Sequence, residues 1–232
     1  MTEFDGFYRR HLPHWQPPGA TLFLTWRLHG SLPREALERV AEERWQLDRL
    51  PARPEETARD RATRHDKRLL ALFDELLSQS RSAPHFLGDE RIARLVTDAL
   101  FFHTGRLYSL EAFVVMPNHV HVLLTPLPIE QGRREAGQAS NSDLYVPLTK
   151  ITQSLKGYTA REANRLLSRT GSPFWQDESY DHCARSEDEA QRIADYIESD
   201  PVRSMLTATP EEWRWSSAWE RVWGRGEQGG RS

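Results

Sequence analysis

The stretch Val114-Val115-Met116-Pro117-Asn118-His119-Val120-His121-Val122-Leu123-Leu124 has an apolar run on each side of a Pro-Asn pair. This pattern predicts two strands joined by a tight turn, because proline fixes φ and asparagine tolerates unusual backbone angles. Alternate side chains of a strand lie on the same face, so His119 and His121 project together from the second strand. Two neutral imidazoles side by side form half of a divalent-metal site, although an isolated His-x-His is more often a surface or hydrogen-bonded pair.

The composition indicates one globular domain with additions. The chain has 232 residues, of which 38% are hydrophobic and 28% charged, and its net charge is −3, so any nucleic-acid-binding face has to be local. The single cysteine, Cys183, excludes a disulfide framework and a zinc site made of cysteines. No apolar run approaches a membrane span, and residues 1–10 lack the apolar core of a signal peptide. We therefore expect a cytoplasmic protein with no membrane partner.

Periodicity along the chain predicts both strands and helices. Residues 20–28 and 107–116 are strand-like, and in the first of them Leu22, Leu24 and Trp26 share one face. A proline at position 201 is expected to end the last long helix at about residue 199. Residues 171–185 are expected to form a loop and then an extended segment. The helices are expected at residues 34–50, 56–81, 89–103, 146–169 and 187–199.

The expected organisation is a basic, aromatic arm, one domain with an insertion, and a tail. The arm is residues 1–19, the domain is residues 20–223 with a helical insertion at 34–82, and the disordered tail is residues 224–232. Four of the eight tryptophans lie between residues 213 and 223, near charged residues. Tryptophans in such a setting can cap a core or stack on nucleobases.

The predicted helix at residues 146–169 carries a row of basic side chains. Arg161, Arg165 and Arg169 recur at every fourth position, Lys156 precedes them, and Glu162 is the one acid in this segment. Such a row is either a solvated face or a track for the phosphates of a nucleic acid.

Tyr196 and Asp200 lie one turn apart, after a capping box formed by Ser186 and Glu189. A tyrosine hydroxyl has a pKa of about 10 and is a poor nucleophile at neutral pH. It becomes useful when a metal polarises a phosphodiester and stabilises the charge that develops on the phosphoryl oxygen. Two imidazoles leave open coordination positions, and Asp200 can supply the oxygen ligand that suits Mg²⁺ or Mn²⁺.

These motifs together resemble the REP-associated tyrosine transposases, a branch of the HUH single-strand transposases. By position, His119 and His121 match the metal-binding histidines of that family, and Tyr196 matches the nucleophile. The family typically has asparagine where this chain has Asp200, so the charge of the third ligand differs here. The matching segments follow family order over nearly the whole chain: HLPHW at 11–15, MPNHVH at 116–121, FWQ at 174–176, YDH at 180–182, YIE at 196–198, PV at 201–202 and WSS at 215–217.

The resemblance implies an α+β fold in which a ferredoxin-like antiparallel sheet carries the histidines and helices pack on one side. It implies a transposase that nicks and joins single-stranded or hairpin-forming repetitive DNA through a covalent 5′-phosphotyrosine, with Mg²⁺ or Mn²⁺ as cofactor. The protein would act as a monomer or a homodimer. The residues expected to grip DNA phosphates are Arg9, Arg10, Lys156, Arg161 and Arg165.

Several alternatives stay open at this point. Tyr158 is a rival nucleophile, although its place on an apolar stripe predicts a core tyrosine, and Tyr180 is expected to be structural. Histidine-triad nucleotide hydrolases are disfavoured because the next position on the same face is Leu123. His-x-His amidohydrolases use barrels of about 250 residues, and this chain is too helical before residue 107. A catalytically silent, regulatory DNA-binding protein would share every binding feature and differ only in cleavage.

Overall fold

The computed structural model describes residues 19–80, 84–129, 144–177 and 179–224. This part of the chain divides into two compact units, a helical unit of residues 30–84 and a sheet unit made of the segments before and after it. The predicted arm, with Arg9 and Arg10, and the tail lie outside the described residues, apart from Gly19 and Gly224. None of the described helices is long and apolar enough to cross a membrane.

The helical unit consists of α1 (Arg34–Arg49) and α2 (Ala58–Gln79), close to the two helices predicted from periodicity. The Thr57 side chain caps α2 by accepting a hydrogen bond from the backbone N–H of Asp60. Arg61 donates to the backbone oxygen of Asp48 and ties the start of α2 to the end of α1. The two helices share a small apolar core formed by Leu32, Ala36, Val40, Leu47, Leu69, Leu76 and Leu77.

The sheet unit is built on four antiparallel strands in the order β2-β3-β1-β4. The strands are β1 (Leu22–Arg27), β2 (Tyr108–Val115), β3 (His119–Pro126) and β4 (Tyr180–Cys183). After the short 3₁₀ turn η1 (Phe86–Gly88), α3 (Glu90–His103) leads into β2, and α4 (Leu148–Leu166) connects β3 to β4. This is the order and connectivity of a ferredoxin-like sheet, so the predicted α+β fold is confirmed.

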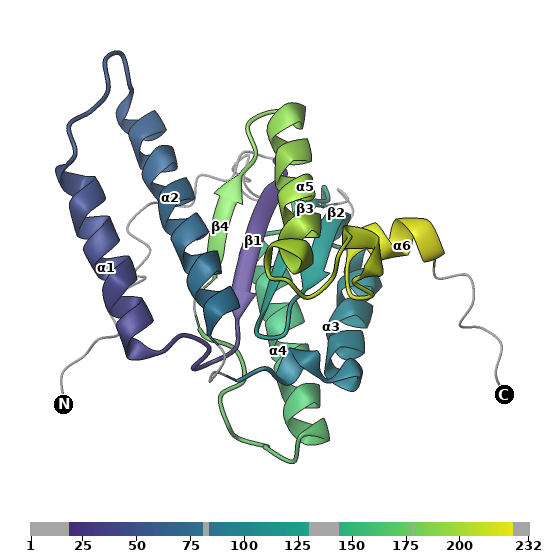
Figure 1. The fold of residues 1–232 in the computed structure, drawn as a ribbon. Coiled ribbons are helices and arrows are strands. Elements are labelled where there is room, and N and C mark those ends of the chain that lie inside the picture. The colour runs from purple at the N-terminus through teal and green to yellow at the C-terminus, as the bar shows by residue number, and fades with distance from the viewer. Residues whose placement is uncertain (1–18, 81–83, 130–143, 178, 225–232) are drawn as a thin grey trace, which may run out of the picture. The chain divides into compact units, whose positions relative to one another are not determined.

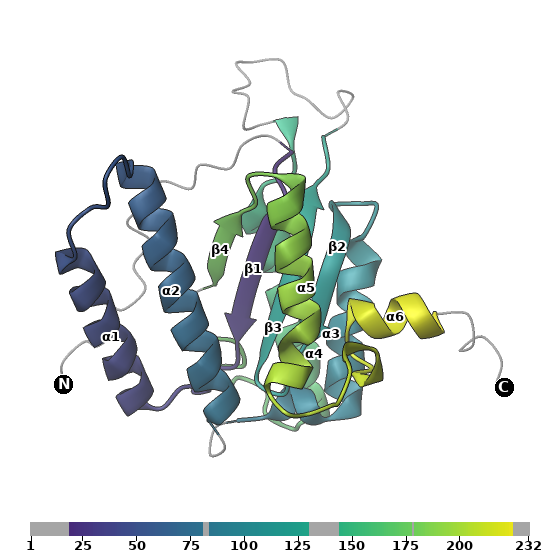
Figure 2. The ribbon, with the colours of Figure 1, turned by 45° about the horizontal axis from the view of Figure 1, so that its top comes forward.

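The two faces of the sheet have different partners (Figures 1 and 2). Leu24, Trp26 and Val122 lie on the face that packs against α3 and α4 and forms the main core. The histidine face is covered by α5 (Glu187–Arg203), whose Ile197 is fully buried. The expectation of helices on one side is therefore correct for α3 and α4 and wrong for α5, because the chain folds back across the opposite face after β4.

Pro201 lies inside α5 and does not end it, contrary to the prediction from sequence. A proline removes one backbone N–H donor, but the last turn is still closed by hydrogen bonds from Ser204 N to Asp200 O (2.9 Å) and from Leu206 N to Pro201 O (2.8 Å). As a result Tyr196, Asp200 and Arg203 are all carried by one helix.

The segment after α5 comprises η4 (Pro210–Glu212) and α6 (Ser217–Trp223) and fastens α5 to the outer edge of β2. The backbone N–H of Val115 donates to Trp215 O (2.8 Å). Ser217 Oγ accepts a hydrogen bond from Phe113 N (3.1 Å) and donates to Glu198 Oε1 (2.6 Å). Arg221 forms an ion pair with the same carboxylate, which is buried at the base of α5. The WSS motif thus holds α5 in place.

We expect Ser217→Ala to lower the free energy of unfolding by about 1–3 kcal/mol, because it leaves a buried N–H and a buried carboxylate oxygen without this partner. Chemical denaturation of the purified protein measures the loss. Ser199→Ala is the matched control, since Ser199 Oγ donates a hydrogen bond to the carbonyl oxygen of Asp195 within its own helix. Equal free energies of unfolding for the two variants would contradict the role of Ser217 in holding α5 to β2.

Candidate metal and nucleophile site

The connection between β2 and β3 is the tight turn predicted from Pro117 and Asn118. It is closed by a hydrogen bond from Met116 N to His119 O (2.9 Å). Neighbouring segments also hold it, since Leu28 N donates to Asn118 O (2.9 Å) and Leu87 N donates to Pro117 O (3.1 Å). The first residues of β3 therefore have a fixed position, and both histidines belong to them.

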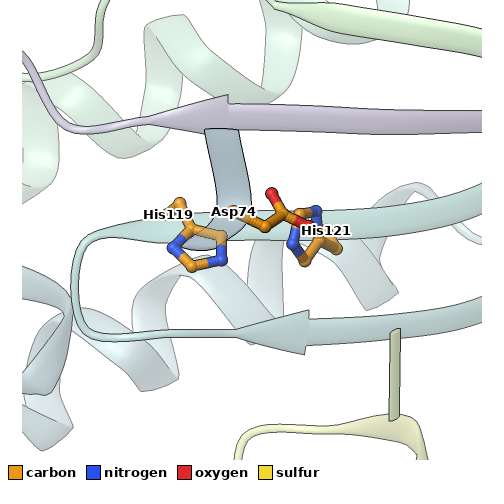
Figure 3. A group of neighbouring side chains, drawn as sticks. All are labelled: Asp74, His119 and His121. Atoms are coloured by element: carbon orange, nitrogen blue, oxygen red, sulfur yellow. The ribbon is translucent and has the colours of Figure 1, made fainter. Parts of the chain in front are cut away.

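The two imidazoles lie side by side on β3, with ring centroids 4.7 Å apart (Figure 3). His119 Nδ1 lies 2.7 Å from Asn118 Oδ1, and His121 Nδ1 lies 2.7 Å from Thr25 Oγ1 on β1. A hydrogen bond at Nδ1 fixes the orientation of a ring and directs Nε2 as the ligand atom. Asp74, also labelled in the figure, belongs to the helical unit.

Asp200 brings a carboxylate to both Nε2 atoms. Its Oδ2 lies 3.1 Å from His119 Nε2 and 3.5 Å from His121 Nε2, while its Oδ1 accepts a hydrogen bond from Arg203 Nη2 (2.9 Å). Burial of the carboxyl opposes ionisation, but the hydrogen bond with His119 and the charges of both histidines and Arg203 lower the pKa of Asp200 to about 2. The carboxylate is therefore ionised at neutral pH.

This donor set fits a divalent cation. Mg²⁺ is held at roughly 2.1 Å in octahedral geometry, so ligand atoms at neighbouring corners lie about 3 Å apart. The two distances from Asp200 Oδ2 to the Nε2 atoms are 3.1 and 3.5 Å, close to that spacing. Two nitrogens and one oxygen would leave coordination positions open for phosphate oxygens.

Tyr196 lies one turn before Asp200 on the same face of α5. Its ring centroid is 6.2 Å from that of His121 and 6.4 Å from that of Phe23 on β1. The Arg203 guanidinium lies over the ring, with Cζ 3.9 Å from the centroid, and its Nη1 donates to Tyr196 O (2.7 Å). The side chain is half-buried. The structure thus places Tyr196 beside the three candidate ligands predicted with it.

The rival tyrosines lie elsewhere. Tyr158 is on α4, which packs on the other face of the sheet, and its side chain is 45% exposed, so the prediction of a core tyrosine is wrong. The buried stripe of α4 instead passes through Thr159, whose hydroxyl accepts a hydrogen bond from Trp175 Nε1 (2.9 Å). Tyr180 is on β4 opposite Thr25, on the histidine face but one strand further from His121.

The predicted DNA-gripping residues are not gathered around this site. Lys156 donates to the backbone oxygens of Gln176 (2.8 Å) and Asp177 (2.9 Å) and holds the loop before β4. Arg161 and Arg165 are exposed on α4, and both pair with Glu162. Arg9 and Arg10 lie outside the described residues.

Three residues that sequence reasoning did not select complete the site: Asn118, Thr25 and Arg203. Asn118 directly precedes His119 in the segment MPNHVH at 116–121, so its position in the sequence could have identified it as a residue of the site. Thr25 shares a predicted strand face with Phe23, but only the pairing of β1 with β3 sets it opposite His121. Arg203 follows Pro201, where the helix was expected to have ended.

Several solved structures are similar to this chain. No protein-family model and no curated protein matches the chain. One solved structure is a REP-associated tyrosine transposase bound to a REP hairpin, with 15% identity over 96% of this chain and 86% of that one, and a TM-score of 0.49. Another is a candidate transposase from Deinococcus radiodurans R1, with 16% identity over 78% of this chain and 89% of that one, and a TM-score of 0.30.

Proposed function

We propose that this protein is a metal-dependent transposase that nicks and joins single-stranded, hairpin-forming DNA through a covalent 5′-phosphotyrosine. One observation carries the proposal: Tyr196 and Asp200 on α5 meet His119 and His121 on β3, although about eighty positions separate the two segments in the sequence. These are the residues that match the nucleophile and metal ligands of the family that the motifs resemble.

In the proposed site, His119 Nε2, His121 Nε2 and Asp200 Oδ2 would hold Mg²⁺ or Mn²⁺. Such an ion, when bound, polarises the phosphodiester and stabilises the charge of the transition state. Asn118 and Thr25 turn the Nε2 lone pairs toward Asp200 by holding the Nδ1 side of each ring. Arg203 holds the other carboxylate oxygen and so keeps Oδ2 directed at the histidines.

The proposed reaction is an in-line displacement at phosphorus. The Tyr196 phenolic oxygen forms a bond to phosphorus and gives its proton to water, while the bond from phosphorus to the 3′ oxygen breaks and that oxygen takes up a proton. The products are a 5′-phosphotyrosine and a free 3′-hydroxyl, and the reverse reaction with another 3′-hydroxyl joins strands. Arg203 restrains the Tyr196 ring by stacking on its face. Arg9, Arg10, Lys156, Arg161 and Arg165 remain the proposed contacts to DNA phosphates.

Incubation with labelled hairpin DNA from the repeats that flank the gene tests the proposal. With Mn²⁺ we expect a DNA–protein band that survives denaturing electrophoresis, and with chelator we expect none. Binding without cleavage in Mg²⁺ or Mn²⁺ would instead support the catalytically silent, regulatory DNA-binding protein. A protein that neither binds nor cleaves this DNA would contradict the substrate assignment.

Thr25→Val is expected to weaken Mn²⁺ binding roughly tenfold, because it removes the hydrogen bond that orients His121 while keeping the shape of the side chain. Isothermal titration of the metal-free protein measures the affinity. Thr21→Val serves as control, since Thr21 Oγ1 lies 2.9 Å from Thr125 Oγ1, whereas Thr25 is the threonine that bonds to His121. The same affinity in both variants would show that Thr25 does not orient the ligand.

A further inference from the structure

A small pocket lies between α3 and the C-terminal segment, outside the candidate metal site. Its volume is about 210 Å³. Typical pockets for drug-sized ligands measure roughly 300–1,000 Å³, so this one has room for about one flat ring system. Arg94, Thr97 and Asp98 line it from α3, and Arg214, Trp215 and Trp219 line it from the other side.

The opposite wall provides flat surfaces. The Arg214 guanidinium lies 5.0 Å from the Trp215 ring and 6.0 Å from the Trp219 ring, and its Nη1 is 3.6 Å from Glu90 Oε1. The backbone is fixed at both indoles, because Trp215 O accepts from Val115 N and Trp219 N donates to Ser216 Oγ. Indole rings and guanidinium planes are the surfaces on which unstacked nucleobases pack in single-strand binding.

We propose that this pocket binds one unstacked nucleobase of single-stranded DNA. This inference rests on the proposed function, because DNA is the substrate proposed for the metal site. The base would stack on Trp215 or Trp219, and its edge would bond to the Asp98 carboxylate, which is exposed at the pocket. Arg94, also exposed there, would meet the adjoining phosphate.

Fluorescence anisotropy tests the pocket by measuring the binding of short, labelled single-stranded oligonucleotides of each base. The measurement is made in chelator, so that the DNA is bound but not cleaved. Trp219→Leu should weaken binding roughly tenfold. Trp223→Leu is the matched control, since Trp223 is on the same helix and 63% exposed, and it should bind like the wild type.

Photocrosslinking with 5-iodouracil in the oligonucleotide, followed by peptide mapping, places the base directly. A crosslink at Trp215 or Trp219 is expected. Normal binding by Trp219→Leu, or crosslinks only elsewhere, would overturn the pocket while leaving the proposed function intact if the Mn²⁺-dependent adduct still forms. If the wild type binds neither single strands nor hairpins and forms no adduct, the proposed function fails together with the pocket.

Discussion

Tyr196→Phe is expected to abolish the covalent DNA adduct while leaving DNA binding and stability close to those of the wild type. The substitution removes the one atom that attacks phosphorus in the proposed reaction and keeps the ring that stacks under Arg203. Loss of a nucleophile lowers a reaction of this kind by a factor on the order of 10⁴ or more, which places the product below detection on a gel.

Two further tyrosines make the test specific. Tyr180→Phe removes a phenolic hydroxyl from β4, on the histidine face of the sheet. Tyr158→Phe removes one from the exposed surface of α4. Both variants should form the adduct at the wild-type level. An adduct that persists in Tyr196→Phe and disappears in Tyr180→Phe would move the nucleophile to β4.

The second large effect is expected at Asp200. Asp200→Ala removes the carboxylate whose Oδ2 lies within 3.5 Å of both Nε2 atoms, and it leaves Arg203 without its ion-pair partner. We expect Mn²⁺ affinity to fall roughly a hundredfold, with adduct formation lost at ordinary metal concentrations, because a charged ligand and its orienting contacts disappear together. Titration of the metal-free protein, followed by electron paramagnetic resonance of Mn²⁺, measures this change.

Asp200→Asn distinguishes the contribution of the ligand oxygen from that of the negative charge, because it removes only the charge. It introduces the residue that the resembled family typically has, and it keeps an oxygen directed at the histidines. We expect metal affinity to fall only about tenfold and adduct formation to return at higher Mn²⁺. Asp195→Ala, an exposed change on the same helix, should alter neither property. Unchanged Mn²⁺ affinity in Asp200→Ala would contradict the assignment of Asp200 as a ligand.

The parts of the fold and site that sequence predicts are the local ones. Alternation within β3 is enough to place His119 and His121 on one face, and Pro117 with Asn118 is enough to predict the turn before them. The same alternation separates Trp26 from Thr25 in β1, as the structure confirms. Helical spacing likewise fixes Tyr196 and Asp200 on one face of α5.

The parts that sequence does not predict depend on pairing between distant segments. No local pattern sets the register that brings Thr25 opposite His121, or sends α5 across the histidine face. Pro201 is misleading because its backbone penalty is local, whereas the hydrogen bonds of the last turn and the packing of Ile197 and Glu198 keep α5 helical. The prediction for Tyr158 is wrong because a residue at the margin of the apolar face of a helix can be either buried or exposed, and only tertiary packing decides which.

Mass-spectrometric mapping of the DNA-linked peptide tests the central claim most directly. The wild-type protein is incubated with hairpin DNA and Mn²⁺, the adduct is digested with nuclease and protease, and the peptide that carries the remaining nucleotide is sequenced. We expect a single modified residue, Tyr196, which is joined through a 5′-phosphate and is unmodified when chelator replaces Mn²⁺. Modification at Tyr180 or Tyr158, or cleavage of DNA without any nucleotide-linked peptide, would contradict the central claim.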